Sequence, residues 1–191
     1  MPWSLLLKSI AADLPLEEMV DEIKDFDERF RLILRKHTSV FTLWSVLNIL
    51  AGLIGLFFLQ NQWWYFSWMN LAWGAINYFL VLHLYNHTYY LRFLQGDILD
   101  RFEVQWHVEN MLWLNIGLDT AYIFAGLFLW SLSFHPQLSD PDLWIGFGLS
   151  VILQGIFLFV MDNLIRYFHR KNLRQCQPFL EQKLNTYQKG A

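Results

Sequence analysis

Three long stretches of this sequence carry almost no formal charge, and together they have room for four membrane-crossing helices. Between Lys36 and Arg92 there is no Asp, Glu, Lys or Arg. From Asn110 to Ser139 the only charged residue is Asp119, and from residue 143 to 165 it is Asp162. A transmembrane helix needs about 20 mostly apolar residues. We therefore predict four spans, at about Ser39–Gln60, Trp63–Leu84, Met111–Leu132 and Leu143–Leu164.

Composition favours an all-α, polytopic membrane protein over a soluble domain. Hydrophobic residues make up 55% of the chain and charged residues only 16%, where a soluble domain carries about 25% charged residues. A globule of 191 residues could not hide four such segments from water. We expect a four-helix membrane bundle at 38–170, an amphipathic cytoplasmic helix within 1–37, and a cytoplasmic tail at 171–191.

The cations predict the orientation of the bundle. All 14 Lys and Arg residues fall before residue 37, in the connection 85–110, or in the tail from Arg166. Cytoplasmic loops carry the excess of Lys and Arg in membrane proteins. Both termini and the middle connection are therefore predicted to be cytoplasmic, in a multi-pass arrangement.

The charged segments are predicted to be mostly helical. Apolar residues at helical spacing before Lys36 predict a helix that leads into the first span and packs under the bundle. In the connection we expect the second helix to run to about Leu94, a turn at Gly96–Asp97, and a new helix into the third span. The tail is expected to be a helical extension that breaks before Pro178.

The two halves of the membrane region show weak internal similarity. LNILAGLIGLF aligns with LDTAYIFAGLF, which places Asn48 over Asp119 and Gly55 over Gly126. AWGAINYFL aligns with LQGIFLFVM, which places Gly74 over Gly155. A parallel duplication would explain this similarity. The small set of residue types that is common in membrane helices would explain it equally well.

Each predicted span carries one polar residue at a similar depth, counted at about 1.5 Å per residue. These four are Asn48, Asn77, Asp119 and Gln154. If all face inward, they enclose a polar centre. Small residues share their helical stripes, for example Gly74 with Asn70 and Asn77. Such stripes are typical of close helix contacts in membranes, so the amides are also explained as interhelical glue.

Asp119 is the strongest functional clue in the chain. Charged groups at membrane depth are costly and usually face a protein interior, a partner or water. As a neutral acid, Asp119 would donate a hydrogen bond to Asn48 or Asn77 and be structural. As an exchangeable acid, it would bind a proton or a cationic substrate. Asp162 lies near the inner interface, one turn from Arg166, and we expect a local ion pair there.

The candidate ligand site gathers the polar layer and its neighbours. Aromatic side chains on the same stripes would favour a flat or cationic ligand. The candidate ligand-binding residues are Asp119, Asn48, Asn77, Asn115, Gln154, Tyr122, Trp73 and Asp162.

Other chemistries find little support in the sequence. Five histidines, His37, His83, His87, His107 and His169, lie near the predicted cytoplasmic interface. His83 and His87 are one turn apart but have no acid between them, so we predict no metal site. No catalytic triad, phosphate loop or cofactor motif is present, and we expect no cofactor. The net charge of −3 suggests no nucleic-acid partner, and one cysteine excludes an internal disulfide.

Three motifs carry a resemblance. They are Trp73-Gly74-x-x-Asn77, Asn115-x-x-x-Asp119-x-x-Tyr122-x-x-x-Gly126, and Gln154-Gly155-x-x-Leu158-x-x-x-Asp162. Over about 38–170 the chain resembles an uncharacterised family of bacterial four-helix integral membrane proteins, a domain of unknown function. The resemblance implies a four-span bundle in a bacterial inner membrane and transfers no function.

Three functions remain open. The first, which we favour, is a small binding or transport protein with an intramembrane site around Asp119, entered from the cytoplasm. Four spans are few for a transporter, so we expect a homodimer surrounded by membrane lipids. The second is an accessory subunit whose polar layer is helix-packing glue and whose cytoplasmic segments dock a protein. The third is an enzyme acting on lipid or quinone through Asp162 and the histidines, although a catalytic set is missing.

Overall fold

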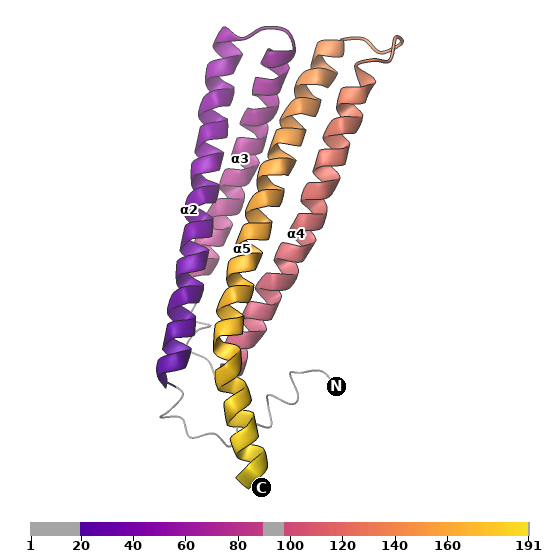
Figure 1. Cartoon of the computed structure of the whole chain (residues 1–191). Coiled ribbons are helices and arrows are strands. Elements are labelled where there is room, and N and C mark those ends of the chain that lie inside the picture. The colour runs from indigo at the N-terminus through magenta and orange to yellow at the C-terminus, as the bar shows by residue number, and fades with distance from the viewer. Residues whose placement is uncertain (1–19, 90–97, 191) are drawn as a thin grey trace.

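A computed structural model describes the backbone of residues 20–89 and 98–190, with side chains for residues 24–83 and 104–176. All regular secondary structure in these ranges is helical, which confirms the predicted all-α class (Figure 1). The helices are α2 (Val20–Phe58), α3 (Gln62–Tyr89), α4 (Ile98–Leu132) and α5 (Pro141–Gly190).

Three of the helices contain segments long and apolar enough to cross a membrane: Lys24–Phe58 in α2, Val104–Leu132 in α4 and Pro141–Cys176 in α5. The remaining predicted span, Trp63–Leu84, is helical throughout in α3. That helix contains no Asp, Glu, Lys or Arg, but it carries several amide, indole and phenol side chains.

The helices form two antiparallel hairpins, α2–α3 and α4–α5, that lie side by side (Figure 1). α5 packs against all three other helices, whereas α4 packs mainly on α5. We call the end where α2 begins and α5 ends the terminal end, and the opposite end the loop end. The arrangement is therefore centred on α5, and the residues of α5 decide which polar side chains meet.

Glycines bring the helices of each hairpin into close contact. A Cβ atom at Gly74 of α3 would lie 2.8 Å from the backbone nitrogen of Ile49 and 3.0 Å from the carbonyl oxygen of Ser45. In the second hairpin, a Cβ atom at Gly155 would lie 3.0 Å from the same two atoms of Ile123 and Asp119. Any side chain at these positions would push the backbones apart, so the approach requires glycine.

The two hairpins repeat this contact, in a register that corrects the sequence alignment. The pairing of Gly74 with Gly155 is confirmed by their matching neighbours. Gly52 and Gly126 form the second matching pair, since each packs against two residues one turn apart on the facing helix. The alignment of Gly55 with Gly126 is therefore wrong by three residues. The same shift places Ser45, rather than Asn48, in the position of Asp119.

The segment before the first predicted span continues that span without a break, because α2 runs from Val20 to Phe58 as one helix. Residues 1–19, which the prediction included in this segment, lie outside the described residues. Phe26, Phe30 and Leu34 are buried, and the Phe30 ring meets the His169 ring of α5 edge-on, with centroids 5.1 Å apart. The part of α2 that precedes the first predicted span therefore packs beside α5.

The expected helix break before Pro178 is wrong, because α5 continues to Gly190. A proline removes only its own backbone donor and clashes with one carbonyl, so a long helix can kink there and continue. The predicted turn at Gly96–Asp97 and the predicted helix end near Leu94 lie outside the described residues.

At the loop end, Asp140 caps the start of α5. Its carboxylate accepts a hydrogen bond from the backbone N–H of Leu143 at 3.3 Å, and Pro141 occupies the first helical position, as helix N-termini favour. The Tyr65 hydroxyl donates a hydrogen bond to the same carboxylate. This acid is thus an exposed structural group, far along α5 from Asp162.

Candidate functional site

A fully buried glutamine joins three helices in the middle of the molecule. The Nε2 group of Gln154 donates hydrogen bonds to Oδ1 of Asn48 on α2, at 2.6 Å, and to Oδ1 of Asn70 on α3, at 3.1 Å. Its Oε1 atom accepts a hydrogen bond from the indole nitrogen of Trp44, at 2.8 Å. Gln154 lies one residue off the helical stripe of Gly155 and Asp162, yet it bridges more helices than any other member of the predicted layer.

The partners of this glutamine are themselves paired. Ser150 donates to Oδ1 of Asn70 at 2.7 Å, and Nδ2 of Asn48 donates to the carbonyl oxygen of Trp44 at 2.8 Å. The Trp44 ring also stacks on Phe157, with centroids 3.8 Å apart. Asn48 and Gln154 therefore act as interhelical glue, as one interpretation of the sequence had it. Trp44 and Ser150 were missed because an indole and a hydroxyl are ordinary residues in membrane helices.

Replacing Gln154 with leucine is expected to destabilise the protein by about 2 kcal/mol. The change removes three interhelical hydrogen bonds, each contributing about 0.6 kcal/mol on average in membrane proteins. The matched control is Asn163→Leu on the same helix, because the Asn163 amide bonds to the carbonyl of Phe159 in its own helix. Unfolding titrations in mixed detergent micelles measure both changes; equal losses would contradict the bridging role.

The other two members of the predicted layer, Asn77 and Asp119, form no hydrogen bond with this cluster. Asn77 is 1% exposed and Asp119 is 3% exposed. Both polar side-chain atoms of Asn77 and Oδ2 of Asp119 are buried without a hydrogen-bond partner in the described part of the chain. The structural alternative, in which Asp119 donates to Asn48 or Asn77, has no such bond among the described residues, because Asn77 has no described partner and Asn48 accepts from Gln154.

The contact between α3 and α4 puts these two residues at the same level. The rings of Trp73 and Tyr122 meet edge-on, with centroids 5.1 Å apart. Moving about one turn toward the terminal end reaches Asn77 on α3 and Asp119 on α4, since the two helices are antiparallel. The two aromatic residues named by the sequence thus lie next to the unpaired polar groups.

Asp162 brings a second carboxylate to the same region from α5. The Asn115 side chain and the Asp119 carboxylate, both on α4, lie close enough to Asp162 to interact with its carboxylate electrostatically. Asp162 Oδ1 lies 3.9 Å from Nε2 of His37 on α2. Among the described residues, neither carboxylate forms an ion pair with a lysine or arginine. Asp162 is buried, so the region holds two acids without a fixed cation.

The expected ion pair between Asp162 and Arg166 is wrong. The Arg166 guanidinium lies over the ring of Trp113, 3.8 Å from its centroid, and its Nε and Nη2 atoms have no described hydrogen-bond partner. An arginine is attracted to the face of an indole ring. Arg166 takes this contact on the α4 side, while Asp162 faces His37 on α2.

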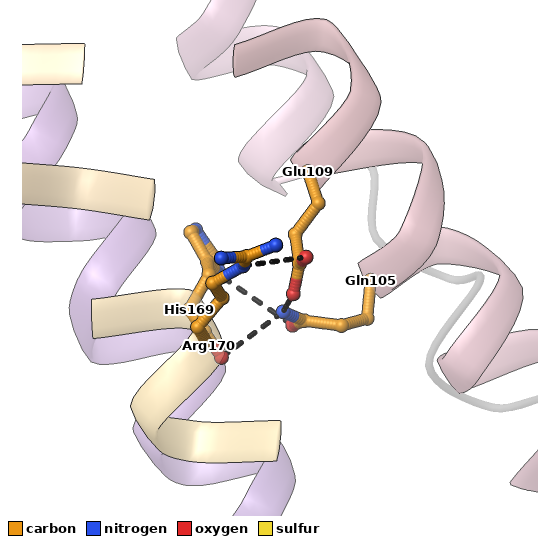
Figure 2. Close-up of polar contacts among 4 residues, drawn as sticks. All are labelled: Gln105, Glu109, His169 and Arg170. Atoms are coloured by element: carbon orange, nitrogen blue, oxygen red, sulfur yellow. Dashed lines mark hydrogen bonds and ion pairs between the residues drawn. The ribbon is translucent and has the colours of Figure 1, made fainter. Parts of the chain in front are cut away.

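A third polar cluster lies nearer the terminal end, where Gln105 and Glu109 of α4 meet His169 and Arg170 of α5 (Figure 2). Nε2 of Gln105 donates to Oε1 of Glu109 at 3.0 Å and to the His169 carbonyl oxygen at 3.1 Å. Nδ1 of His169 lies 3.4 Å from Oε1 of Gln105. Glu109 also forms an ion pair with Arg170, at 3.6 Å. The cluster ties the terminal halves of α4 and α5 together.

On the opposite side of α5, and at about the same level, Asn172 connects α5 to α2. Nε of Arg29 donates to its Oδ1 at 2.7 Å, and its Nδ2 donates to the Phe26 carbonyl oxygen at 3.1 Å. Three polar clusters therefore follow one another along α5. The middle one, around Asp119 and Asp162, contains two buried carboxylates that form no ion pair with a lysine or arginine of the described residues.

Comparison with known proteins places the chain in one family. A family model described as "Family of unknown function (DUF6992)" matches residues 40–163, which is well over half of the chain. The chain belongs to this family, which confirms the resemblance to an uncharacterised domain family. The matched range contains Asn48, Asp119 and Asp162. No curated protein and no solved structure matched the chain.

Proposed function

We propose that this member of the DUF6992 family is an integral membrane protein that binds a proton or a small cation at a buried site. The site consists of Asp119, Asp162, Asn77 and Asn115, and Trp73 and Tyr122 border it. One observation carries the proposal: Asn77 and Asp119 keep buried polar atoms with no hydrogen-bond partner among the residues that the structure describes, while the neighbouring Gln154 cluster is paired. Buried polar groups are almost always paired, so an orphaned set calls for a ligand or water.

The membrane setting is part of the proposal. Three helices have the length and composition of spans, and α3 lies antiparallel to α2. With 28 residues, α3 is about 42 Å long at the helical rise per residue. If α2 crosses the bilayer, α3 returns through it. We therefore propose four spans in a bacterial inner membrane, with the loop end outside and both termini cytoplasmic.

A cysteine introduced at the loop end tests this topology. His135 lies in the exposed turn between α4 and α5, so His135→Cys is expected to react with a membrane-impermeant maleimide added to intact cells. The parent chain is the control, since its single cysteine, Cys176, is buried. Labelling of the variant only after the membrane is broken would contradict the proposed orientation.

The chemistry of the site favours a cation. Two carboxylates with no lysine or arginine partner supply negative charge, and the amides of Asn77 and Asn115 supply oxygens. The rings of Trp73 and Tyr122 attract organic cations through their faces. Two nearby carboxyl groups cannot both carry a negative charge easily, so one of them holds a proton. A bound cation would replace this proton, because its positive charge balances the second negative charge.

The test is proton release from the purified protein. Adding methylammonium or tetramethylammonium to the protein in weakly buffered detergent should release protons, detected with a pH dye. The same cation should raise the melting temperature, because a ligand that binds only the folded state stabilises it. A wild-type protein that shows neither effect with these cations, nor with sodium or potassium, would contradict the proposal.

Transport and dimer formation extend this proposal. Asp162 and His37 lie between Asp119 and the terminal end of the bundle, which is cytoplasmic in the proposed topology. This placement suits entry of the cation from the cytoplasm. Four helices offer little room for a complete path, so we propose a homodimer in the membrane. Light scattering of the detergent-solubilised protein should give twice the chain mass; a monomeric mass would contradict this extension.

A second candidate is an accessory membrane subunit, and the fully paired Gln154 cluster favours it. In that case the polar residues would hold helices together, and the cytoplasmic segments would dock a protein. Asp119→Asn would then leave the cell's phenotype unchanged, and purification from native membranes would recover a stoichiometric partner. Cation-dependent proton release by the protein alone would argue against it.

A further inference from the structure

Arg166 lies at the surface of the α4–α5 hairpin, with its charge placed over an aromatic ring. The central carbon of its guanidinium is 3.8 Å from the ring centroid of Trp113 on α4. Trp113 is 54% exposed, and Arg166 is only partly buried. The stacked pair therefore holds a positive charge in a defined position near the outer surface of the protein.

The hydrogen-bond donors of the Arg166 guanidinium have no described partner. Its Nε and Nη2 atoms are buried without one, and such a pair of nitrogens binds a carboxylate or a phosphate through two parallel hydrogen bonds. Two acids on the surrounding helices are used elsewhere, since Asp162 lies against His37 and Glu109 pairs with Arg170. Buried donors are almost always paired. This edge of Arg166 therefore calls for an oxyanion that the described residues do not supply.

Two more arginines follow Arg166 on the same helix. Arg170 lies one turn and Arg174 two turns further toward the terminal end. Side chains four residues apart on a helix are neighbours, and like charges at this spacing repel each other. Glu109 offsets the charge of Arg170 through an ion pair of 3.6 Å (Figure 2). No acid among the described residues pairs with Arg166 or Arg174, so this part of α5 has an excess of positive charge.

The stacked pair has the depth of lipid headgroups in the proposed topology. Arg166 lies two residues past the fourth predicted span, and Trp113 lies near the cytoplasmic start of the third. Trp106, two turns before Trp113 on α4, is also exposed. Tryptophans gather at the level of the headgroups, and basic side chains on the cytoplasmic side attract anionic lipids. The oxyanion within reach of Arg166 at this depth is the phosphate of a phospholipid.

The surface next to this pair on the membrane side is apolar. On α4, the face of Trp113 continues to Gly117, where a Cβ atom would meet nothing within 4 Å, and then to the exposed ring of Phe124. On α5, the face of Arg166 continues two turns away to the exposed ring of Phe159. Residues four or seven apart share one face of a helix. The arginine thus adjoins a surface that suits the acyl chains of the same lipid.

We propose that Arg166, Arg170 and Trp113 form a binding site for the phosphate of an anionic phospholipid in the cytoplasmic leaflet. This inference goes beyond the proposed function, because none of the three residues belongs to the cation site. It shares with that proposal only the membrane setting and the orientation.

Each of the three residues has a separate part in binding. The phosphate accepts two hydrogen bonds from the Nε–Nη2 edge of Arg166, which turns outward when the guanidinium rotates in its own plane over the indole ring. Trp113 keeps the guanidinium in place through the cation–π contact. Arg170 adds a second positive charge one turn away. A zwitterionic lipid brings a cation along with its phosphate, so the two arginines favour a headgroup with a net negative charge.

The first test compares an anionic with a zwitterionic lipid. The purified full-length protein in detergent is titrated with dioleoylphosphatidylglycerol or dioleoylphosphatidylcholine, and bound lipids are counted by native mass spectrometry. The wild type should bind its first phosphatidylglycerol about tenfold more tightly. Arg166→Gln should remove this preference, because a hydrogen bond to a charged group contributes about a factor of ten in affinity. A wild type without the preference, or an Arg166→Gln variant that keeps it, would overturn the site.

Two matched controls separate this site from a general attraction of basic residues to an anionic surface. Arg174→Gln removes the same charge from the same helix and should keep most of the preference; a loss equal to that of Arg166→Gln would overturn the site. Trp113→Leu should weaken phosphatidylglycerol binding, whereas Trp106→Leu, at an exposed indole on the same helix, should not. Equal binding by the two tryptophan variants would contradict the role of the stack.

The second test distinguishes a lipid from a soluble phosphate. Phosphatidylglycerol should raise the melting temperature of the protein, because a ligand that binds the folded state stabilises it. Glycerol phosphate at the same concentration lacks the acyl chains and should not. Stabilisation by glycerol phosphate that Arg166→Gln abolishes would overturn the lipid assignment.

The variant Asp119→Asn separates this site from the cation site. It should bind phosphatidylglycerol as the wild type does, because Asp119 takes no part in holding the phosphate. If lipid binding depends on Arg166 while the wild type shows no response to cations, the lipid site is supported and the proposed function alone is contradicted. Loss of the lipid preference in Asp119→Asn, with the fold intact, would overturn a separate lipid site.

Discussion

Gly126→Leu is expected to prevent the native α4–α5 hairpin from forming. A Cβ atom at this position would already lie 2.8 Å from the carbonyl oxygen of Gly148 and from the backbone nitrogen of Ile152. Backbone atoms cannot move aside as a flexible side chain can, and a leucine adds three more carbons. Overpacking costs about 1–3 kcal/mol for smaller insertions, and this change should exceed that range. The measurement is the folded fraction of purified protein in detergent.

Gly117→Leu is the matched control on the same helix. A Cβ atom at Gly117 would meet nothing within 4 Å, so the leucine faces outward. It should leave the folded fraction unchanged or raise it slightly, because leucine favours helix over glycine by up to about 1 kcal/mol. If Gly126→Leu folded as well as Gly117→Leu, the close contact between α4 and α5 would be wrong.

Asp119→Asn is expected to abolish cation-dependent proton release while the protein stays folded. Asparagine has nearly the same shape as aspartate but carries neither the charge nor the exchangeable carboxyl proton. The loss should be complete, because only Asp162 then remains as an acid at the site, and it already lies 3.9 Å from His37. The pH-dye assay measures the release, and thermal unfolding checks the fold.

Asp140→Asn provides the control for that experiment, since it makes the same chemical change at the exposed cap of α5. Asparagine caps helices as well as aspartate does, and Asp140 has a positive φ of 61°, which asparagine tolerates. This variant should release protons as the wild type does. Equal release from Asp119→Asn would show that Asp119 is structural.

The helices could be predicted from the sequence because bilayer length and the absence of charge constrain a chain strongly. Each predicted span is helical, apart from the last two residues of the first, since α2 ends at Phe58. The sequence does not reveal how the four helices associate, because membrane helices are apolar on most faces. The central place of α5 depends on which helix face each side chain occupies, and a shift of one residue changes that face. Gln154, for example, lies one position off the glycine stripe of its helix.

The polar layer was predicted as one ring, and the structure divides it in two. Depth alone grouped Asn48, Asn77, Asp119 and Gln154, since rise along a helix is fixed. Which of them meet depends on helix rotation and on the wider separation of α3 from α4. The histidines were recognised as a group near one interface, but His37 and Asp162 are brought together by tertiary packing that no local spacing encodes.

The internal repeat illustrates the same limit. The alignment matched Asn48 to Asp119 because both are polar, whereas the glycine contacts match Ser45 to Asp119. A three-residue shift still looks acceptable in a helical pattern, because nearly one full turn restores the same face. The register is determined by the backbone contacts of the glycines, Gly74 with Gly155 and Gly52 with Gly126.

The most direct test of the cation site is a crystal structure of the protein grown in a lipidic phase with methylammonium. The account predicts non-protein density within hydrogen-bonding distance of the Asn77 amide and the Asp119 carboxylate, bordered by Trp73 and Tyr122. A direct hydrogen bond between Asn77 and Asp119, in a dry and closely packed interface with no density between them, would contradict it.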